Sequence, residues 1–202
     1  KLSVFRNAFN ILMIIPFVNR LICRKYYASG IGIYFINSFN KRILGVNSGG
    51  DFLINFTSRV NSPKKLIVLN GKNVSSVFLS LASSGGCYYQ AINGIEIGEG
   101  TIWSNNCSFI SANHSFKNMQ THIEASKIEI GKHVWLGSNC VVLPGVKIGD
   151  HSIIGAGSIL TKNVSKYSIM AGNPANLVAK RCKHCLDKIP FNASSESCNN
   201  CS

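Results

Sequence analysis

Aliphatic side chains recur every six residues through the second half of the chain. From position 130 the sequence divides into six units in register, IGKHVW, LGSNCV, VLPGVK, IGDHSI, IGAGSI and LTKNVS. The first position of each unit is aliphatic, the fifth is Val, Cys or Ser, and glycine follows the first residue in four units. A short, fixed period of this kind is typical of repeat architectures, in which stacked units bury a continuous core.

This period predicts a parallel β-helix. Each unit supplies a short strand that points one aliphatic side chain inward, followed by a tight turn, and three units close a triangular coil of 18 residues. The fifth position has to be small because it lies inside a corner. Gly, Asn and Asp near the corners tolerate the backbone angles that such turns require. Parallel strands normally connect through right-handed crossovers, so the pattern alone does not predict a left-handed coil.

The same pattern appears upstream in the units IGEGTI, WSNNCS and FISANH, which span residues 97–114. The register restarts at Ile130, so 15 residues, 115–129, are inserted between two coils. Farther upstream the spacing persists with poorer residues, at Leu69, Ser75, Leu81 and Cys87. We therefore expect about five coils from near Phe52 to Val164, the first of them irregular.

The expected fold is all-β and has three parts. Residues 1–50 form a basic, partly amphipathic segment that is helical or irregular. Residues 51–166 form the β-helix with its inserted loop 115–129. Residues 167–202 form a C-terminal extension that contains a short helix and a cysteine-rich tail.

The stretch from Gly131 to Arg181 resembles the signature region of the hexapeptide-repeat acetyltransferases, and the resemblance extends over about residues 95–181. It is greatest to the maltose, galactoside and capsule or lipopolysaccharide O-acetyltransferases. The resemblance implies a left-handed β-helix, acetyl-CoA as co-substrate, and a homotrimer with active sites between neighbouring prisms.

The register of the repeat sorts the five histidines. His133 and His151 occupy the fourth position of a unit, on an outward corner where a polar side chain is simply solvated, and His184 lies in the cysteine-rich tail. His114 is the last residue before the insertion, and His122 lies inside it. Functional residues gather on loops that a rigid scaffold positions. The family's base is the histidine that opens this loop, so the resemblance assigns His114 as general base, with His122 as the alternative.

The resemblance also implies a coenzyme A site. Ser138 and Ala156 are both third in their units and 18 residues apart, so they share a corner along which the pantetheine arm would run. Trp135 would line the acyl site, or else pack at a subunit contact. The family often has basic residues where this chain has Asn176 and Ala179. The remaining cofactor-binding residues that the resemblance implies are Gly155, Thr161, Lys162, Lys180 and Arg181.

Two C-x2-C pairs, separated by twelve residues, end the chain: Cys182, Cys185, Cys198 and Cys201. This pattern favours a structural zinc site that holds together a tail too short to have its own core. His184 could replace one ligand. Disulfides and free thiols are the alternatives, and disulfides are disfavoured because nothing in the sequence indicates export.

Charge is scarce and unevenly distributed. Only 14% of the residues are charged, although the net charge is +13. Residues 1–72 carry eleven basic residues and one acidic residue, whereas residues 73–202 carry ten and seven. A basic half is compatible with an anionic substrate, a nucleic acid or a membrane surface. No helix-turn-helix, RNP-type motif or arginine-rich run is present, so we expect no nucleic acid partner.

These features lead to one expected function, an acetyl-CoA-dependent O-acetyltransferase. The expected acceptor is a carbohydrate, a bacterial surface polysaccharide such as a capsule of sialic-acid type or an O-antigen, or a precursor of one. A small sugar or an antibiotic is the alternative acceptor. Two alternatives belong to other functional classes: a non-catalytic β-helix protein and a β-helix enzyme of the γ-carbonic-anhydrase type. The latter needs three zinc-binding histidines with a spacing that His114, His122 and His133 do not show.

The apolar stretch Ala8–Val18 is too short to span a membrane, which takes about 20 residues. No cleavage site for a signal peptide follows it. We expect a helix that packs on the domain or lies on the inner face of the membrane, and therefore a cytoplasmic protein. Four basic residues would assist membrane contact: Arg6, Arg20, Arg24 and Lys25.

Overall fold

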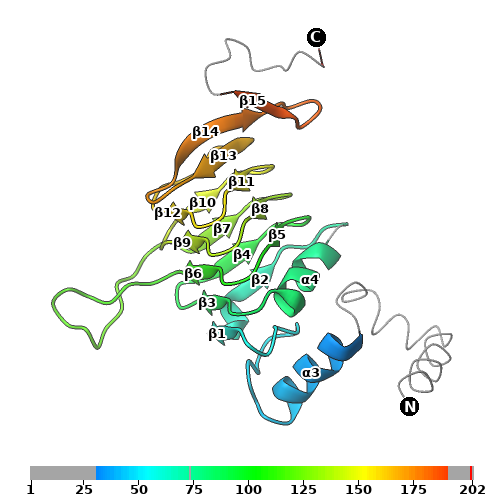
Figure 1. The fold of residues 1–202 in the computed structure, drawn as a ribbon. Helices are drawn as coiled ribbons and strands as arrows, with labels where there is room; N and C mark the ends of the chain where they lie inside the picture. Colours follow the sequence, from blue (N-terminus) through cyan, green and yellow to red (C-terminus); the bar gives the residue numbers. More distant parts are fainter. Residues whose placement is uncertain (1–30, 73, 191–200, 202) are drawn as a thin grey trace.

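The computed structural model describes residues 31–72, 74–190 and 201, and over most of this range the chain winds into a triangular prism (Figure 1). Three sheets form its faces. Sheet A contains β1 (Arg59–Asn61), β3 (Tyr88–Gln90), β6 (Ser108–Ile110), β9 (Val141–Val142) and β12 (Ile159–Leu160). Sheet B contains β2 (Leu66–Val68), β4 (Ile95–Ile97), β7 (Ile128–Ile130) and β10 (Lys147–Ile148). Sheet C contains β5 (Ile102–Trp103), β8 (Trp135–Leu136), β11 (Ile153–Ile154), β13 (Ser168–Ala171), β14 (Asn176–Arg181) and β15 (Lys188–Pro190).

The strand register confirms the six-residue period. Leu136 pairs with Ile154, and Val142 pairs with Leu160, so successive coils are 18 residues apart. The five strands of sheet A correspond to the five coils expected from the sequence. The predicted left-handed parallel β-helix is confirmed.

Each position of the repeat has one physical role. The first positions fill the interior, as Ile130, Leu136 and Ile154 show, and the fifth positions lie buried inside the corners. The fourth positions turn the chain through the left-handed region, with φ between 53° and 75°. Gly, Asn and His tolerate that region best. One of these three residue types occupies the fourth position in seven units, at Gly100, Asn106, His133, Asn139, Gly145, His151 and Gly157.

Glycine at the second position follows from how closely the coils stack. A Cβ atom on Gly137 would lie 2.6 Å from the backbone nitrogen of Ala156 in the next coil. No side chain fits at that distance, so this corner can only be closed by glycine. The second position of the repeat therefore reflects how closely the coils stack, and the fourth position reflects how the chain turns.

The upstream coils differ from the expectation because a helix interrupts them. The residues read as a degraded repeat between Leu69 and Cys87 include α4 (Ser75–Ser83), which follows the 3₁₀ helix η2 (Pro63–Lys65) and β2. This part of the prediction is wrong. Val77 and Leu81 of α4 are fully buried, so their aliphatic spacing reflects one packed face of a helix.

Helix α3 (Ile31–Arg42) lies within the segment expected to be helical or irregular, and contacts α4. The buried Asn37 amide donates to the carbonyl of Ala82 (2.9 Å), and its oxygen accepts from the backbone of Phe56 (2.9 Å). The stretch Ala8–Val18 lies outside the described residues. Within the described part of the chain, no helix has both the length and the apolarity needed to cross a membrane.

The C-terminal extension adds strands to sheet C. β13 continues the parallel stack, β14 pairs antiparallel with β13, and β15 pairs antiparallel with β14, forming the end of the prism shown in orange in Figure 1. The prediction of a short helix around Lys180 and Arg181 is wrong, because these residues end β14. Burial alternates along this strand, and Leu177 and Ala179 are more buried than Asn176, Val178 and Lys180.

Candidate active site

The insertion between two coils forms a projecting hairpin, drawn in green in Figure 1. Ile97 of one coil pairs with Ile130 of the next, so the 15 additional residues leave the prism without disturbing the register. Backbone hydrogen bonds close the hairpin, from Ser115 to Thr121 and from Ile123 to Asn113 (both 2.8 Å). At its tip, Phe116 is 94% exposed.

His114 and His122 face each other at the base of this hairpin. They form an antiparallel bridge, and their ring centroids are 4.5 Å apart. Both side chains are exposed. The two residues considered as general base therefore occupy one place, at the corner between sheets A and B, and His114 is held nearer to the rigid coil.

A groove of about 400 Å³ runs along sheet C, on the other side of sheet B from His114. Its floor is an outward-facing apolar row formed by Ile102, Trp135 and Ile153, which are neighbours in the strand register. Trp135 is 49% exposed and stands in the middle of this row. A half-exposed Trp over an apolar groove suits either a ligand or a second chain.

One wall of the groove is a stack of rings that the sequence analysis missed. His133 and His151 lie parallel, 5.0 Å apart, and Tyr167 stacks on His151 at 5.1 Å. The expectation that both histidines are simply solvated is wrong. Their common fourth position, 18 residues apart, was the available signal, because it places one ring directly above the other.

Burial, His133 and Arg181 together lower the pKa of His151. Its Nδ1 is buried and has no hydrogen-bond partner. An uncharged imidazole fits this wall, since protonation would place a positive charge beside the Arg181 guanidinium. His151 is therefore held in its neutral form over a wider pH range than an isolated histidine.

This lowered pKa predicts how stability depends on pH. The unfolded chain takes up a proton on His151 near pH 6.5, whereas the folded chain resists it until the pH is lower. Because of His151, the free energy of unfolding should decrease as the pH falls below about 6.5, until the pKa of His151 in the folded chain is reached. Asn tolerates the same backbone conformation at position 139. The loss of stability between about pH 7.5 and 5.5, measured by urea unfolding, should thus be smaller in the His151→Asn variant. Equal losses in both proteins would contradict this assignment.

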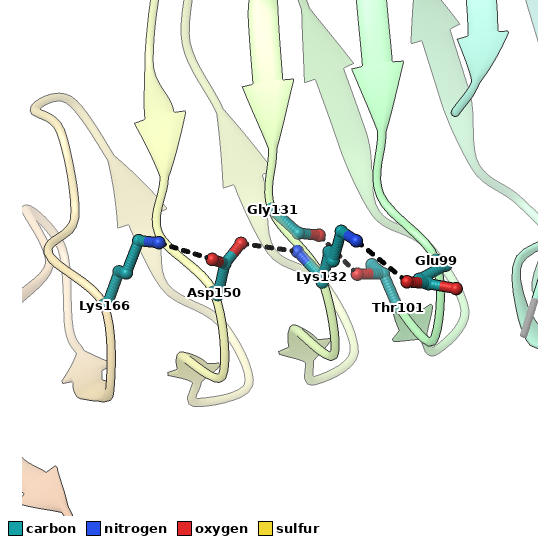
Figure 2. A network of polar contacts seen from close by, with 6 residues as sticks. All are labelled: Glu99, Thr101, Gly131, Lys132, Asp150 and Lys166. Carbon is teal, nitrogen blue, oxygen red and sulfur yellow. Dashed lines mark hydrogen bonds and ion pairs between the residues drawn. The ribbon is translucent and has the colours of Figure 1, made fainter. Parts of the chain in front are cut away.

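A ladder of alternating charges lies beside these rings. Figure 2 shows Glu99, Lys132, Asp150 and Lys166 on successive coils. Lys132 Nζ lies 2.9 Å from Glu99, and Lys166 Nζ lies 2.7 Å from Asp150. Asp150 also accepts from the backbone N–H of Lys132 at 2.9 Å, which ties one coil to the next. Exposed pairs of this kind contribute little to stability, so the ladder chiefly orders the corner.

Ser138 and Ala156 lie together at the corner between sheets C and A. The backbone N–H of Gly157 donates to the carbonyl of Ser138 at 2.8 Å, which places the two third positions on adjacent coils. Gly155 precedes Ala156 at the same corner, and Ala156 is exposed. Small side chains leave this corner accessible to an extended ligand.

The other residues assigned to coenzyme A are divided between two corners. Thr161 and Lys162 are exposed at the corner between sheets A and B, next to β12. Lys180 and Arg181 lie at the far end of sheet C, where β14 pairs with Ser168. Arg181 donates to the carbonyls of His151 and Leu186, both at 3.0 Å, and lines the groove beside Trp135. The structure thus brings Arg181 to the groove and not to Lys162.

Comparisons with known proteins agree with this architecture. Residues 127–162 match the family described as bacterial transferase hexapeptide (six repeats). A chloramphenicol acetyltransferase of Klebsiella aerogenes is 47% identical over 58 residues, which are 29% of this chain and 28% of that protein. One of Agrobacterium fabrum is 40% identical over 60 residues, 30% of this chain and 29% of that protein.

Solved structures show the same fold. A hexapeptide-repeat-containing acetyltransferase of Vibrio cholerae, in complex with acetyl coenzyme A, has a TM-score of 0.51 at 22% identity. The match covers 61% of this chain and 64% of that chain. The chain spans between 28% and 38% of the length of three curated relatives, which are the two chloramphenicol acetyltransferases and one putative acetyltransferase. The resemblance stated from the sequence is confirmed over the coils, where residues 127–162 match the hexapeptide repeats of bacterial transferases.

Proposed function

We propose that this protein is an acetyl-CoA-dependent O-acetyltransferase that works as a homotrimer on a carbohydrate hydroxyl. The observation that carries the proposal is the position of His114, an exposed imidazole at the base of the hairpin that interrupts the hexapeptide coils. The open Ser138–Ala156 corner supplies a path for the coenzyme. The similarity of residues 127–162 to transferase repeats supports the second of these assignments, because Ser138 and Ala156 lie within the matched range.

For acetyl transfer, the protein mainly has to supply a base and hold the two substrates in a fixed geometry. His114 would take the proton of the acceptor hydroxyl as its oxygen attacks the thioester carbonyl. The tetrahedral intermediate then collapses and breaks the carbon–sulfur bond. The departing thiolate receives the proton from the imidazolium, so that the products are an acetyl ester and coenzyme A, and His114 is again neutral.

The coenzyme site would use residues from different corners of the prism. The pantetheine arm would lie on the corner formed by Ser138, Gly155 and Ala156, where small side chains allow close approach. Thr161 and Lys162 would meet the adenosine and phosphate end, where a cation is favourable. Lys180 and Arg181 would contribute from the end of sheet C.

An anionic polysaccharide of the bacterial surface, or its precursor, is the acceptor that we favour. The net charge of +13 supports a negatively charged partner. A small alcohol such as an antibiotic is the second candidate, because the curated relatives include two chloramphenicol acetyltransferases. The matches cover only 28% and 29% of those two proteins, so an antibiotic is placed second.

Membrane contact and a cytoplasmic location remain predictions. Within the described part of the N-terminal segment, α3 exposes Phe35 and Phe39, its last turn contains Lys41 and Arg42, and the next residue, Ile43, is exposed as well. Apolar and basic side chains in such proximity favour the surface of an anionic membrane.

A coenzyme A release assay with a panel of acceptors tests the proposed function. We expect turnover with oligosaccharides of sialic or uronic acid, less with neutral oligosaccharides, and acetyl esters in the product by mass spectrometry. Turnover with chloramphenicol alone would favour the second candidate. If isothermal titration detected no binding of acetyl-CoA, the enzyme assignment itself would be wrong.

A further inference from the structure

Three cysteine thiols converge where the chain leaves the prism. Cys182 directly follows β14, Cys185 lies in the turn to β15, and Cys201 returns to the same point from the end of the chain. Their Sγ atoms all lie within 4.8 Å of one another. Cys182 is fully buried and the other two are exposed, so the cluster is anchored on the sheet and open on one side.

The separations suit a metal better than a disulfide. Cys182 Sγ lies 3.8 Å from Cys201 Sγ. A disulfide would bring two sulfurs to about 2.05 Å. Thiolates around a tetrahedral zinc, each at about 2.3 Å from the ion, lie about 3.8 Å from one another. The observed distance is therefore that of two adjacent corners of a zinc tetrahedron.

The turn between β14 and β15 is folded around the first thiol. The backbone N–H of His184 points to Cys182 Sγ at 3.4 Å, and the N–H of Leu186 donates to the carbonyl of Cys182 at 3.0 Å. These two contacts hold the Cys182 side chain and the start of the turn in place. Leu186 has φ 64°, which is unfavourable for a branched side chain and indicates a turn held by the surrounding structure.

We propose that Cys182, Cys185 and Cys201 bind a zinc ion as thiolates, each releasing its proton to solvent. Thiolate sites favour Zn²⁺ because it accepts tetrahedral geometry and binds sulfur ligands well. Cys198 completes the second C-x2-C pair in the sequence, and it lies outside the described residues. The site is independent of acetyl transfer, so it stands even if the proposed function fails.

Metal binding would also hold one wall of the groove. Leu186, the residue after the second ligand, lines the groove beside Trp135, and its carbonyl accepts from Arg181 Nε. The guanidinium in turn reaches the carbonyl of His151 at 3.0 Å. A short chain of contacts thus leads from the thiol cluster to the ring stack. Losing the metal should loosen this wall and expose the turn, without affecting the stacked coils.

Metal analysis of the full chain, purified with reductant, tests the proposal. We expect about one zinc ion per chain in the wild type, with loss of zinc in the Cys185→Ser and Cys201→Ser variants, whose exposed thiols can be replaced without disturbing the core. Cys140→Ser is the matched control, because serine already occupies the equivalent fifth position at Ser152 and Ser158. It should retain the metal.

Two further measurements keep the proposal falsifiable if a variant folds poorly. Cobalt(II) added to the apoprotein should give the thiolate charge-transfer band and the intense visible bands of a tetrahedral site. A chelator should open Lys183 and Lys188 to trypsin while the coils stay resistant. The proposal would be overturned by zinc retained in both tail variants, by a wild type without zinc or cobalt bands, or by a disulfide among these thiols in reduced protein.

Discussion

Replacing His114 by alanine should lower the rate of acetyl transfer at least about a hundredfold, the usual contribution of a general base. A sugar hydroxyl is a poor nucleophile while protonated, and His114 is the imidazole that the rigid coil holds at the mouth of the hairpin. Binding of acetyl-CoA should be nearly unchanged, because Ser138 and Ala156, which would hold the pantetheine arm, lie at another corner. Steady-state kinetics together with isothermal titration of acetyl-CoA separates these two effects.

The matched control is His122→Ala, since the two rings are only 4.5 Å apart in an otherwise similar environment. We expect a smaller loss, because His122 belongs to the projecting hairpin and would orient His114 or the acceptor. A hundredfold loss in His122→Ala with an active His114→Ala would reverse the assignment. In that case the base would be the residue inside the insertion.

The coils could be predicted because each repeat position meets one strict physical demand. Leu136 and Ile154 must fill the interior, Gly137 must leave room for the next coil, and His151 must adopt a left-handed backbone. Such demands are local and repeat every 18 residues, so they are visible in the sequence. The same reasoning located the 15-residue insertion, which the pairing of Ile97 with Ile130 confirms.

The parts of the fold that were not predicted depend on contacts that the six-residue repeat does not indicate. The spacing of Val77 and Leu81 fits both a degraded coil and a helix packed on one face, and the helix is what forms. The segment around Lys180 was expected to be a helix because of the family resemblance. The open edge of β13 provides backbone partners for a strand there, which satisfies the N–H and C=O groups of β14.

The site was predicted in part. Ser138 and Ala156 do share a corner, because residues separated by 18 positions occupy the same place on adjacent coils of this fold. The groove around Trp135 was missed as a whole, since Arg181 and Leu186 reach it through the β14–β15 turn. Long-range packing of that kind leaves no pattern in the repeat.

Mixing two inactive variants should restore activity if active sites are shared between chains. His114 lies at the corner between sheets A and B, whereas Trp135 lies on sheet C, and the whole of sheet B separates them. One chain therefore cannot bring its own base to its own acyl groove. In a ring of three chains, the base of one prism can face the groove of its neighbour.

The test mixes His114→Ala and Trp135→Ala chains, each of which should have little activity alone, and lets them exchange subunits at equal concentration. A site that takes its base from one chain and its groove from the next is intact in about a quarter of random combinations, so about a quarter of the wild-type rate should return. Double-variant chains mixed with wild type provide the control for exchange. If activity stays at the level of the separate variants although mixed trimers form, or if wild-type chains are fully active as monomers in sedimentation, each site lies within one chain and His114 must reach an acceptor that Trp135 does not touch.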